Sequence, residues 1–196
     1  LGAASVPVFE VPRVALLSSG DELLPVEAQL TEGKIHDSNS YALAAQIEQA
    51  RARVIRLGVA ADTRAAVESL LDKAADSSAN FIITSAGVSV GAFDFVKEVV
   101  ESRGSLNFWR VNMRPGKPLA FGSFREIPFV GLPGNPVSAF VGFEVFVRPM
   151  LGRMSGSMDG EALRPVSSAA SAIASSESRS VPLAAECSQT QFMTLM

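Results

Sequence analysis

Short apolar runs alternate with amphipathic segments of helical period along the first three quarters of the chain, and this alternation constrains the fold most. Each apolar run is followed by Gly, Ser or acidic residues, which is typical of buried parallel strands. The expected strands are 14–17, 54–57, 81–83 and 106–111, with a hairpin of 119–124 and 127–132 at one end of the sheet. The expected helices are 41–51, 63–75, 93–103 and 137–150. This order predicts an α/β fold, a mostly parallel sheet flanked by helices.

Composition and charge exclude several classes of function. The formal net charge of −3 gives no electrostatic case for binding nucleic acid or an anionic membrane. The only cysteine and the only histidine are Cys187 and His36, which excludes an internal disulfide framework, a multi-cysteine zinc site and a histidine-cluster metal centre. Prolines and glycines interrupt the uncharged stretch 127–143, so it predicts a strand, a turn and a helix instead of a membrane span. Without a signal-peptide pattern at the start, we expect a cytoplasmic protein.

A change of composition near Gly152 divides the chain. Residues 1–12 are expected to form a connecting segment, and residues 13–153 the α/β domain. A linker rich in Gly, Ser and Met then leads into a Ser- and Ala-rich tail with short apolar pieces. Segment 154–196 is too short for a core of its own, so we expect it to be part of a small C-terminal β domain.

Carboxylates follow the predicted strands, and ligands bind at the carboxyl ends of strands in an open parallel sheet. They come from three separate loops and are Asp21, Glu22, Asp62 and Asp94. Hard oxygen ligands of this kind suit Mg²⁺. Asp62 and Asp94 also lie where acidic residues favour the start of a helix, so both interpretations stay open.

Two further loops carry groups that suit anions. Loop 84–91 joins a strand to a helix and combines glycines, serine hydroxyls and a helix N-terminus, which can bind phosphate. It is neither a Walker loop nor a dinucleotide fingerprint, and taken alone the segment is better explained as an ordinary turn between a strand and a helix. Arg110, Arg114 and Lys117 surround the second loop. Arginine binds oxyanions through paired hydrogen bonds, although a solvated basic loop would have the same composition.

Five ordered motifs resemble those of the molybdopterin molybdenumtransferase family, which includes the MoeA proteins and the gephyrin E domain. The motifs lie at 18–23, 33–39, 84–91 with 94–97, 114–122 and 131–139. The Pro-Gly-Asn-Pro sequence of the last motif is the most diagnostic. The resemblance covers roughly residues 11–156 and implies a sheet like that of the molybdopterin adenylyltransferases.

The resemblance implies Mg²⁺-dependent insertion of molybdate into adenylylated molybdopterin, with release of AMP. By motif match, Glu22, Asp62 and Asp94 take the places of the family's catalytic and metal-binding acids. The same match implies substrate or anion binding by Ser85, Gly87, Ser89, Gly91, Arg110, Arg114, Lys117, Pro133, Asn135 and Pro136. Because both substrates are anions, we expect the acids to hold Mg²⁺ against the pyrophosphate while the basic loop holds molybdate.

The chain departs from the family pattern at three positions. Ala86 stands where a glycine is usual, and its Cβ restricts the approach of the backbone to a ligand. Ala92 stands where the family has an acid, and Arg51 where a glycine usually ends a helix. The first two departures bear on the anion-binding loop, and the third bears only on how the helix ends.

The family's two N-terminal domains have no counterpart here, and its C-terminal β domain is normally longer. We therefore expect part of a longer enzyme. The resemblance implies a homodimer formed through those domains and a molybdopterin adenylyltransferase as a partner, with no nucleic acid or membrane involved. Two alternatives stay open: an adenylyltransferase that uses the same loop for ATP, and a non-catalytic scaffold that binds a partner peptide. The Pro-Gly-Asn-Pro loop and the sequence beyond Gly152 favour the transferase.

Overall fold

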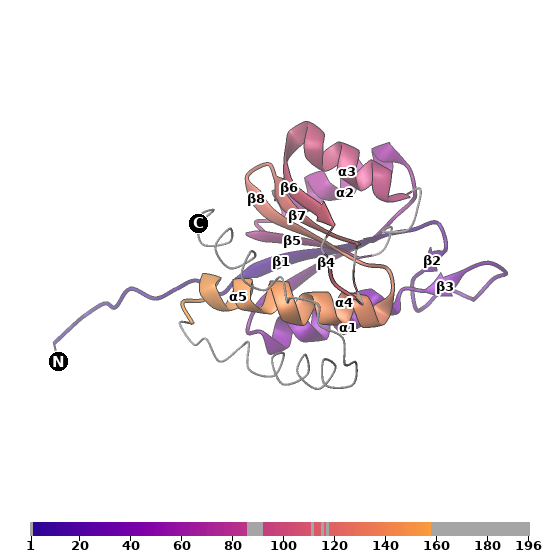
Figure 1. Ribbon diagram of the computed structural model, residues 1–196. Coiled ribbons are helices and arrows are strands. Elements are labelled where there is room, and N and C mark those ends of the chain that lie inside the picture. Colours follow the sequence, from indigo (N-terminus) through magenta and orange to yellow (C-terminus); the bar gives the residue numbers. More distant parts are fainter. Residues whose placement is uncertain (1, 86–91, 111, 115, 117, 158–196) are drawn as a thin grey trace, which may run out of the picture. The chain divides into compact units, whose positions relative to one another are not determined.

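A six-stranded sheet forms the centre of the domain (Figure 1). The computed structural model describes residues 2–85, 92–110, 112–114, 116 and 118–157, with only the backbone for 92–94 and 109–110. The strands are β1 (Arg13–Ser19), β4 (Arg53–Ala60), β5 (Phe81–Ser85), β6 (Gly104–Arg110), β7 (Pro118–Phe124) and β8 (Ile127–Leu132). Their order is β4-β1-β5-β8-β7-β6, and only β7 runs against its neighbours. The expected α/β fold with a mostly parallel sheet is confirmed.

Helices cover both faces of this sheet (Figure 1). On one face lie α2 (Arg64–Asp76) and α3 (Ala92–Arg103), and on the other lie α1 (Ser38–Gln49), α4 (Pro136–Gly142) and α5 (Arg148–Met154). A π-helical turn, η1 (Phe143–Val147), joins α4 to α5. The helix expected at 137–150 is therefore continuous but contains one wider turn. None of the helices in the described part of the chain is long and apolar enough to span a membrane.

The buried strands explain the apolar runs in the sequence. All of β5 and nearly all of β1 are buried, because helices pack on both sides of them. Helix α4 lies on the face of the sheet opposite to α2 and α3. Its buried residues are small: Ser138, Ala139 and Gly142. Phe140 is therefore directed away from the sheet and is 51% exposed. The helical spacing of Phe140, Phe143 and Phe146 predicts that all three belong to the core. This is correct for Phe143, which is fully buried, and wrong for Phe140, whereas Phe146 is half-buried.

Two features of the topology differ from the expectation or go beyond it. The β7–β8 hairpin is internal, because β8 pairs with β5 and β6 forms the edge of the sheet. Two very short parallel strands, β2 (Leu23–Leu24) and β3 (Ile35–His36), form a separate arm that extends from the end of β1 (Figure 1). The β domain expected at 154–196 lies almost wholly outside the described residues and stays a prediction.

Candidate functional site at the rim of the sheet

The carboxyl ends of β1, β4, β5, β6 and β8 lie at one rim of the sheet, where β7 begins. The loops with Asp21 and Asp62 follow β1 and β4, whereas the basic loop joins β6 to β7. Since neighbouring strands are about 4.8 Å apart, the ends of β1 and β7 are separated by about 14 Å. Acidic and basic groups therefore occupy different ends of the rim. A ligand that reaches both must be elongated, or two ligands must bind side by side.

Asp21 and Asp62 hold each other's loops in place. The Asp62 N–H donates to Asp21 Oδ1 at 2.9 Å, and the Asp21 N–H donates to Asp62 Oδ2 at 3.3 Å. Asp62 Oδ1 is buried and has no hydrogen-bond partner among the described residues. Burial is the largest effect on the pKa of Asp62 and raises it; the Asp21 N–H opposes this rise, and the charges of Asp21 and Glu22 add to it. The result is a carboxylate that favours a cation or a proton beside it.

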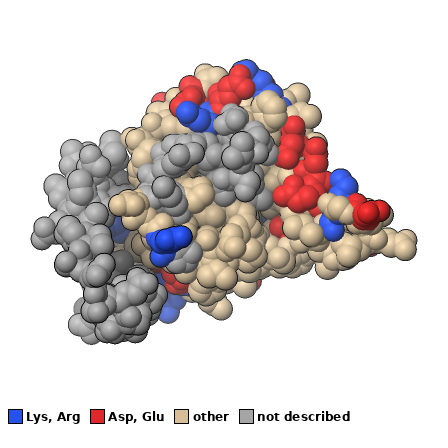
Figure 2. Space-filling model, turned by 45° about the vertical axis from the view of Figure 1, so that its right-hand side comes forward, with Lys and Arg blue, Asp and Glu red and all other residues tan. Residues whose placement is uncertain are grey.

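Glu22 is exposed next to Asp21. We call Asp21, Glu22 and Asp62 the acidic corner of the rim. Its carboxylate folds back over Gly20, where an added Cβ would lie 2.7 Å from Glu22 Oε2. Gly20 also has a φ of 151°, so a glycine is required there. Figure 2 shows acidic side chains gathered on this part of the surface. The backbone of Asp94 lies in the first turn of α3, but its side chain is outside the described part.

The described carboxylates do not form a complete metal cage. Among the residues whose side chains are described, no group of three or more His, Cys, Asp or Glu is arranged to hold a metal ion. Magnesium commonly takes only one or two protein carboxylates and completes its shell with water and substrate phosphates. Asp62, with its unpartnered Oδ1, and the adjacent Asp21 fit that pattern.

Hydroxyl groups without partners lie at the ends of β1 and β5. Ser19 Oγ, Thr84 Oγ1 and Ser85 Oγ are buried and have no hydrogen-bond partner in the part of the chain that is described. Leaving a buried polar group unpaired costs about 1–3 kcal/mol, so this cluster is suited to form hydrogen bonds with a ligand or water. Of these three, only Ser85 was predicted as a binding residue; Ser19 and Thr84 fall within the motif 18–23 and the loop 84–91, but their hydroxyls were not singled out. The available signal was a hydroxyl residue at the end of an otherwise apolar strand.

The first turn of α1 ties two parts of the rim together. Asp37 Oδ2 accepts a hydrogen bond from Ser18 Oγ at 2.9 Å, and Asp37 Oδ1 accepts one from the Ser40 N–H at 3.1 Å. Asn39 Nδ2 donates to the carbonyl oxygen of Gly134 at 2.8 Å. The turn thus connects the end of β1 to the Pro-Gly-Asn-Pro loop. Residues 37–39 belong to the family motif at 33–39, but these contacts were not predicted from the sequence.

The Pro-Gly-Asn-Pro loop also starts helix α4. Asn135 Oδ1 accepts a hydrogen bond from the Ser138 N–H at 3.1 Å, and Pro136 takes the first helical position. Both are common ways to begin a helix. Pro133 is buried, whereas Asn135 and Pro136 are exposed. The anion-binding role expected of these three residues stays a prediction, beside the structural role of the last two.

The basic loop packs against the start of α4. Gly116 has a φ of 105°, and a Cβ added there would lie 2.8 Å from Met113 Cε and 3.7 Å from the carbonyl oxygen of Ser138. Arg114 in this loop is exposed and makes no ion pair with another described residue. Arg110 ends β6, but its side chain lies outside the described part. The expected site residues Gly87, Ser89, Gly91 and Lys117 lie wholly outside it.

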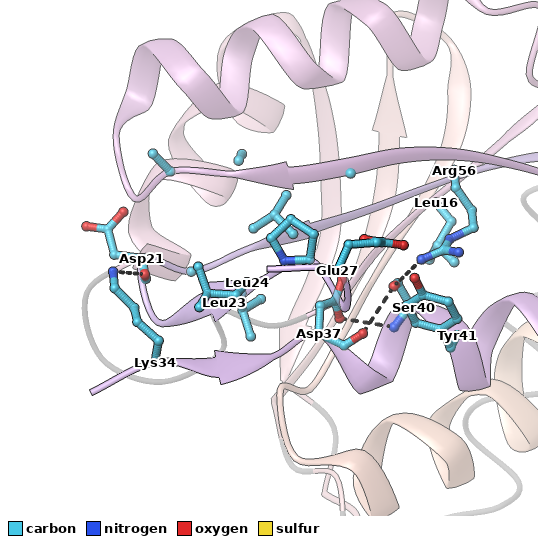
Figure 3. Close-up of a pocket in the computed structure, with 16 residues that line it drawn as sticks. Leu16, Asp21, Leu23, Leu24, Glu27, Lys34, Asp37, Ser40, Tyr41 and Arg56 are labelled. Atoms are coloured by element: carbon cyan, nitrogen blue, oxygen red, sulfur yellow. Dashed lines mark hydrogen bonds between the residues drawn. The ribbon is translucent and has the colours of Figure 1, made fainter. Parts of the chain in front are cut away.

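A cavity of about 460 Å³ opens beside the acidic corner (Figure 3). It lies between the β2–β3 arm, the first turn of α1 and strand β4. Gly20 and Asp21 line it on the side of the rim. The cavity was not anticipated, because its walls are brought together from four separate segments of the chain.

Fold and rim define the class: an α/β domain with a polar site at the carboxyl ends of a doubly covered parallel sheet. Residues 15–153 match the family described as a probable molybdopterin binding domain, and the chain belongs to that family. It is 44% identical over 156 residues to the molybdopterin molybdenumtransferase of Haemophilus influenzae, covering 80% of this chain and 38% of that protein. It is 43% identical over 165 residues to molybdopterin molybdenumtransferase 2 of Mycobacterium tuberculosis, covering 81% and 40% respectively.

Solved structures agree with this assignment. The molybdopterin biosynthesis MoeA protein of Pyrococcus horikosii superposes with a TM-score of 0.70 at 32% identity, over 76% of this chain and 37% of that one. The resemblance to the MoeA-like family is thereby confirmed. The chain spans about two fifths of the length of these relatives.

Proposed function

We propose that this domain takes part in molybdenum cofactor biosynthesis by inserting molybdate into adenylylated molybdopterin, with release of AMP. The observation that carries the proposal is the division of the rim into an acidic corner and a basic loop, with unpartnered buried hydroxyls between them. Adenylylated molybdopterin is elongated and carries a pyrophosphate, and molybdate is a compact oxyanion. A rim on which the end of β1 and the start of β7 lie about 14 Å apart, with acidic groups at one end and basic groups at the other, suits such a pair.

The basic residues and the hydroxyls of the rim would bind different parts of the substrates. Arg114, with Lys117 of the same loop and Arg110 at the end of β6, would bind molybdate through charge-assisted hydrogen bonds. The hydroxyls of Ser19, Thr84 and Ser85 would donate to oxygens of the bound substrates. These groups would bind and orient the anions without any change of their own protonation.

Asp62 and Asp21 are the described residues that fit Mg²⁺, and Glu22 and Asp94 are the further acids that the family resemblance implies. A bound Mg²⁺ ion would supply positive charge against the phosphate oxygens of the substrate. Without that charge, the acidic corner would repel a pyrophosphate. The raised pKa of Asp62 supports the proposal, because it marks a carboxylate whose negative charge lacks compensation from the protein.

The test mixes the full chain with adenylylated molybdopterin, molybdate and Mg²⁺ and measures AMP. Molybdate-dependent release of AMP supports the proposal. Equilibrium binding of adenylylated molybdopterin and of molybdate to the same chain is measured in parallel, because binding by this domain is required even where turnover is slow. Failure to bind either substrate, or consumption of ATP instead, would contradict it. ATP consumption would indicate an adenylyltransferase.

Asp62→Asn tests the acidic corner. The variant should abolish Mg²⁺-dependent AMP release and leave the fold intact, since burial already disfavours the charge. Glu48→Gln, on the exposed side of α1, is the matched control and should behave like wild type. Unchanged turnover in Asp62→Asn would show that the acidic corner takes no part in the reaction.

The homodimer and the adenylyltransferase partner belong to the same proposal and are tested by light scattering and co-purification.

A further inference from the structure

We infer that the cavity beside the acidic corner binds an amino-substituted, fused heteroaromatic ring of the substrate. This rests on the proposed function, because adenylylated molybdopterin carries two such rings, an adenine and a pterin. The cavity shares Gly20 and Asp21 with the rim. A ring bound inside it would therefore place an attached phosphate beside Asp21 and Asp62.

Size and lining favour a flat ring with polar edges. The volume of about 460 Å³ lies within the range of 300–1,000 Å³ typical of small-molecule sites. Leu16 and Val59 line it from the sheet, and Leu23, Leu24 and Pro25 from the arm. Apolar walls with a few polar groups are the usual arrangement for binding a heterocycle.

Tyr41 and Arg56 give the cavity a flat π-rich wall. The Arg56 guanidinium lies 3.8 Å from the centroid of the Tyr41 ring. It also donates through Nη2 to Ser40 Oγ at 3.0 Å, which fixes its position. Figure 3 shows the two side chains together at one end of the cavity. Guanidinium and aromatic planes both stack on heteroaromatic rings.

Glu27 is the lining carboxylate that has a partner for neither of its oxygens among the described residues. Both oxygens of the Asp37 carboxylate are already engaged by Ser18 and Ser40. The Asp21 carboxylate accepts from the Asp62 N–H. Glu27, in contrast, lines the cavity and has no hydrogen bond or ion pair with any described residue. A carboxylate can only accept hydrogen bonds, so it selects a ring that carries amino or N–H groups.

Lys34 closes the end of the cavity toward the rim. Its Nζ donates to the carbonyl oxygen of Asp21 at 2.6 Å, which ties the residue before β3 to the loop after β1 (Figure 3). An ammonium group there suits a phosphate that leaves the cavity toward the acidic corner. The order of groups is thus aromatic wall, free carboxylate, ammonium and then the rim. In a nucleotide or a pterin phosphate, the ring, its polar edge and the phosphate follow one another in the same order. The ring would meet the aromatic wall, its edge the carboxylate and its phosphate the ammonium group.

The test uses the fact that Tyr41 is the only tyrosine of the chain. Labelling tyrosine rings with ¹³C gives resonances from this residue alone. AMP and 6-hydroxymethylpterin are titrated separately, with ribose 5-phosphate as the ligand without a ring. We expect a saturable shift with AMP, with the pterin, or with both, and none with ribose 5-phosphate; which ring acts identifies the source. No saturable shift with either ring compound, or an equal shift with ribose 5-phosphate, would overturn the inference.

Glu27→Gln provides the matched variant. Loss of a charge-assisted hydrogen bond should weaken binding of the active ring compound about tenfold or more. Glu32→Gln, an exposed residue between β2 and β3 that does not line the cavity, should bind like wild type. Equal affinity in both variants would refute the role of Glu27. Molybdate-dependent AMP release is measured independently: release without ring binding at Tyr41 rejects the cavity alone, and ring binding without release rejects the proposed reaction alone.

Discussion

Replacing Arg51 by glycine should stabilise the domain. Helix α1 ends with the Ala52 N–H donating to the Ile47 carbonyl oxygen at 3.1 Å and the Arg51 N–H donating to the Glu48 carbonyl oxygen at 2.9 Å. These two bonds define a Schellman motif, whose C′ residue is left-handed and usually glycine. Arg51 occupies that position with a φ of 59°.

The expected gain follows from two opposing terms. A non-glycine residue in the left-handed region costs about 1–2 kcal/mol. Glycine removes this cost but loses more backbone entropy on folding, which offsets about 0.5–1 kcal/mol. Arg51 is exposed and makes no ion pair with another described residue, so little else changes. We expect a net gain of about 0.5–1 kcal/mol, equivalent to a rise in Tm of about 1–4 °C.

Thermal and urea denaturation, followed by circular dichroism, measure this gain. Arg51→Ala separates relief of strain from loss of the arginine side chain, because alanine keeps the left-handed cost and should leave stability near that of wild type. Arg53→Gly, two residues later in β4, is the control for glycine in ordinary extended backbone and should lower Tm. The reasoning is refuted if Arg51→Gly is no more stable than Arg51→Ala.

Three further outcomes are expected. Glu126→Gly in the β7–β8 turn, where φ is 67°, should raise the free energy of unfolding by about 0.5–1 kcal/mol in urea titrations; lower stability would contradict this. Asn39→Ala should lose the bond to Gly134 and about 1 kcal/mol of stability, and ¹⁵N NMR should show shifts centred on the Pro-Gly-Asn-Pro loop. Because the pKa of Asp62 is raised when folded, its ionisation opposes folding, so wild-type stability should fall as pH rises above the unfolded value of about 3.8. Asp62→Asn should weaken that decline and denature at a higher urea concentration at pH 7, and an unchanged pH profile would count against the burial argument.

The order of strands and helices was predictable because strands that are buried on both faces of the sheet have continuous apolar sequences. It did not predict where the β7–β8 hairpin sits, because residue patterns within a strand carry no information on which strands become neighbours. The β2–β3 arm was missed for another reason. Each of its strands has two residues, too few to display any period.

The candidate site was predictable where it depends on position after a strand. Asp62 and Ser85 were found in this way, and both have a buried oxygen without a partner among the described residues. The contacts of Asp37 and Asn39 were not predictable, since their partners lie 19 and 95 residues away in the sequence. Glu27 and Tyr41 belong to the same class, because the cavity that they line exists only after the arm has folded over β4.

The polar groups of the rim lower the stability of this domain. Three buried hydroxyls lack partners among the described residues, and a partly buried carboxylate has a raised pKa. Each unpaired hydroxyl opposes folding by about 1–3 kcal/mol, and the ionised Asp62 carboxylate opposes it as well. The dense apolar core on both faces of β1 and β5 offsets this cost. A ligand that satisfies these groups binds only the folded state and should stabilise it by about 2.7 kcal/mol at one hundred times its Kd. Thermal shift with molybdate, Mg²⁺ and a pyrophosphate compound, added singly and together, therefore reports directly whether the polar rim is a binding site.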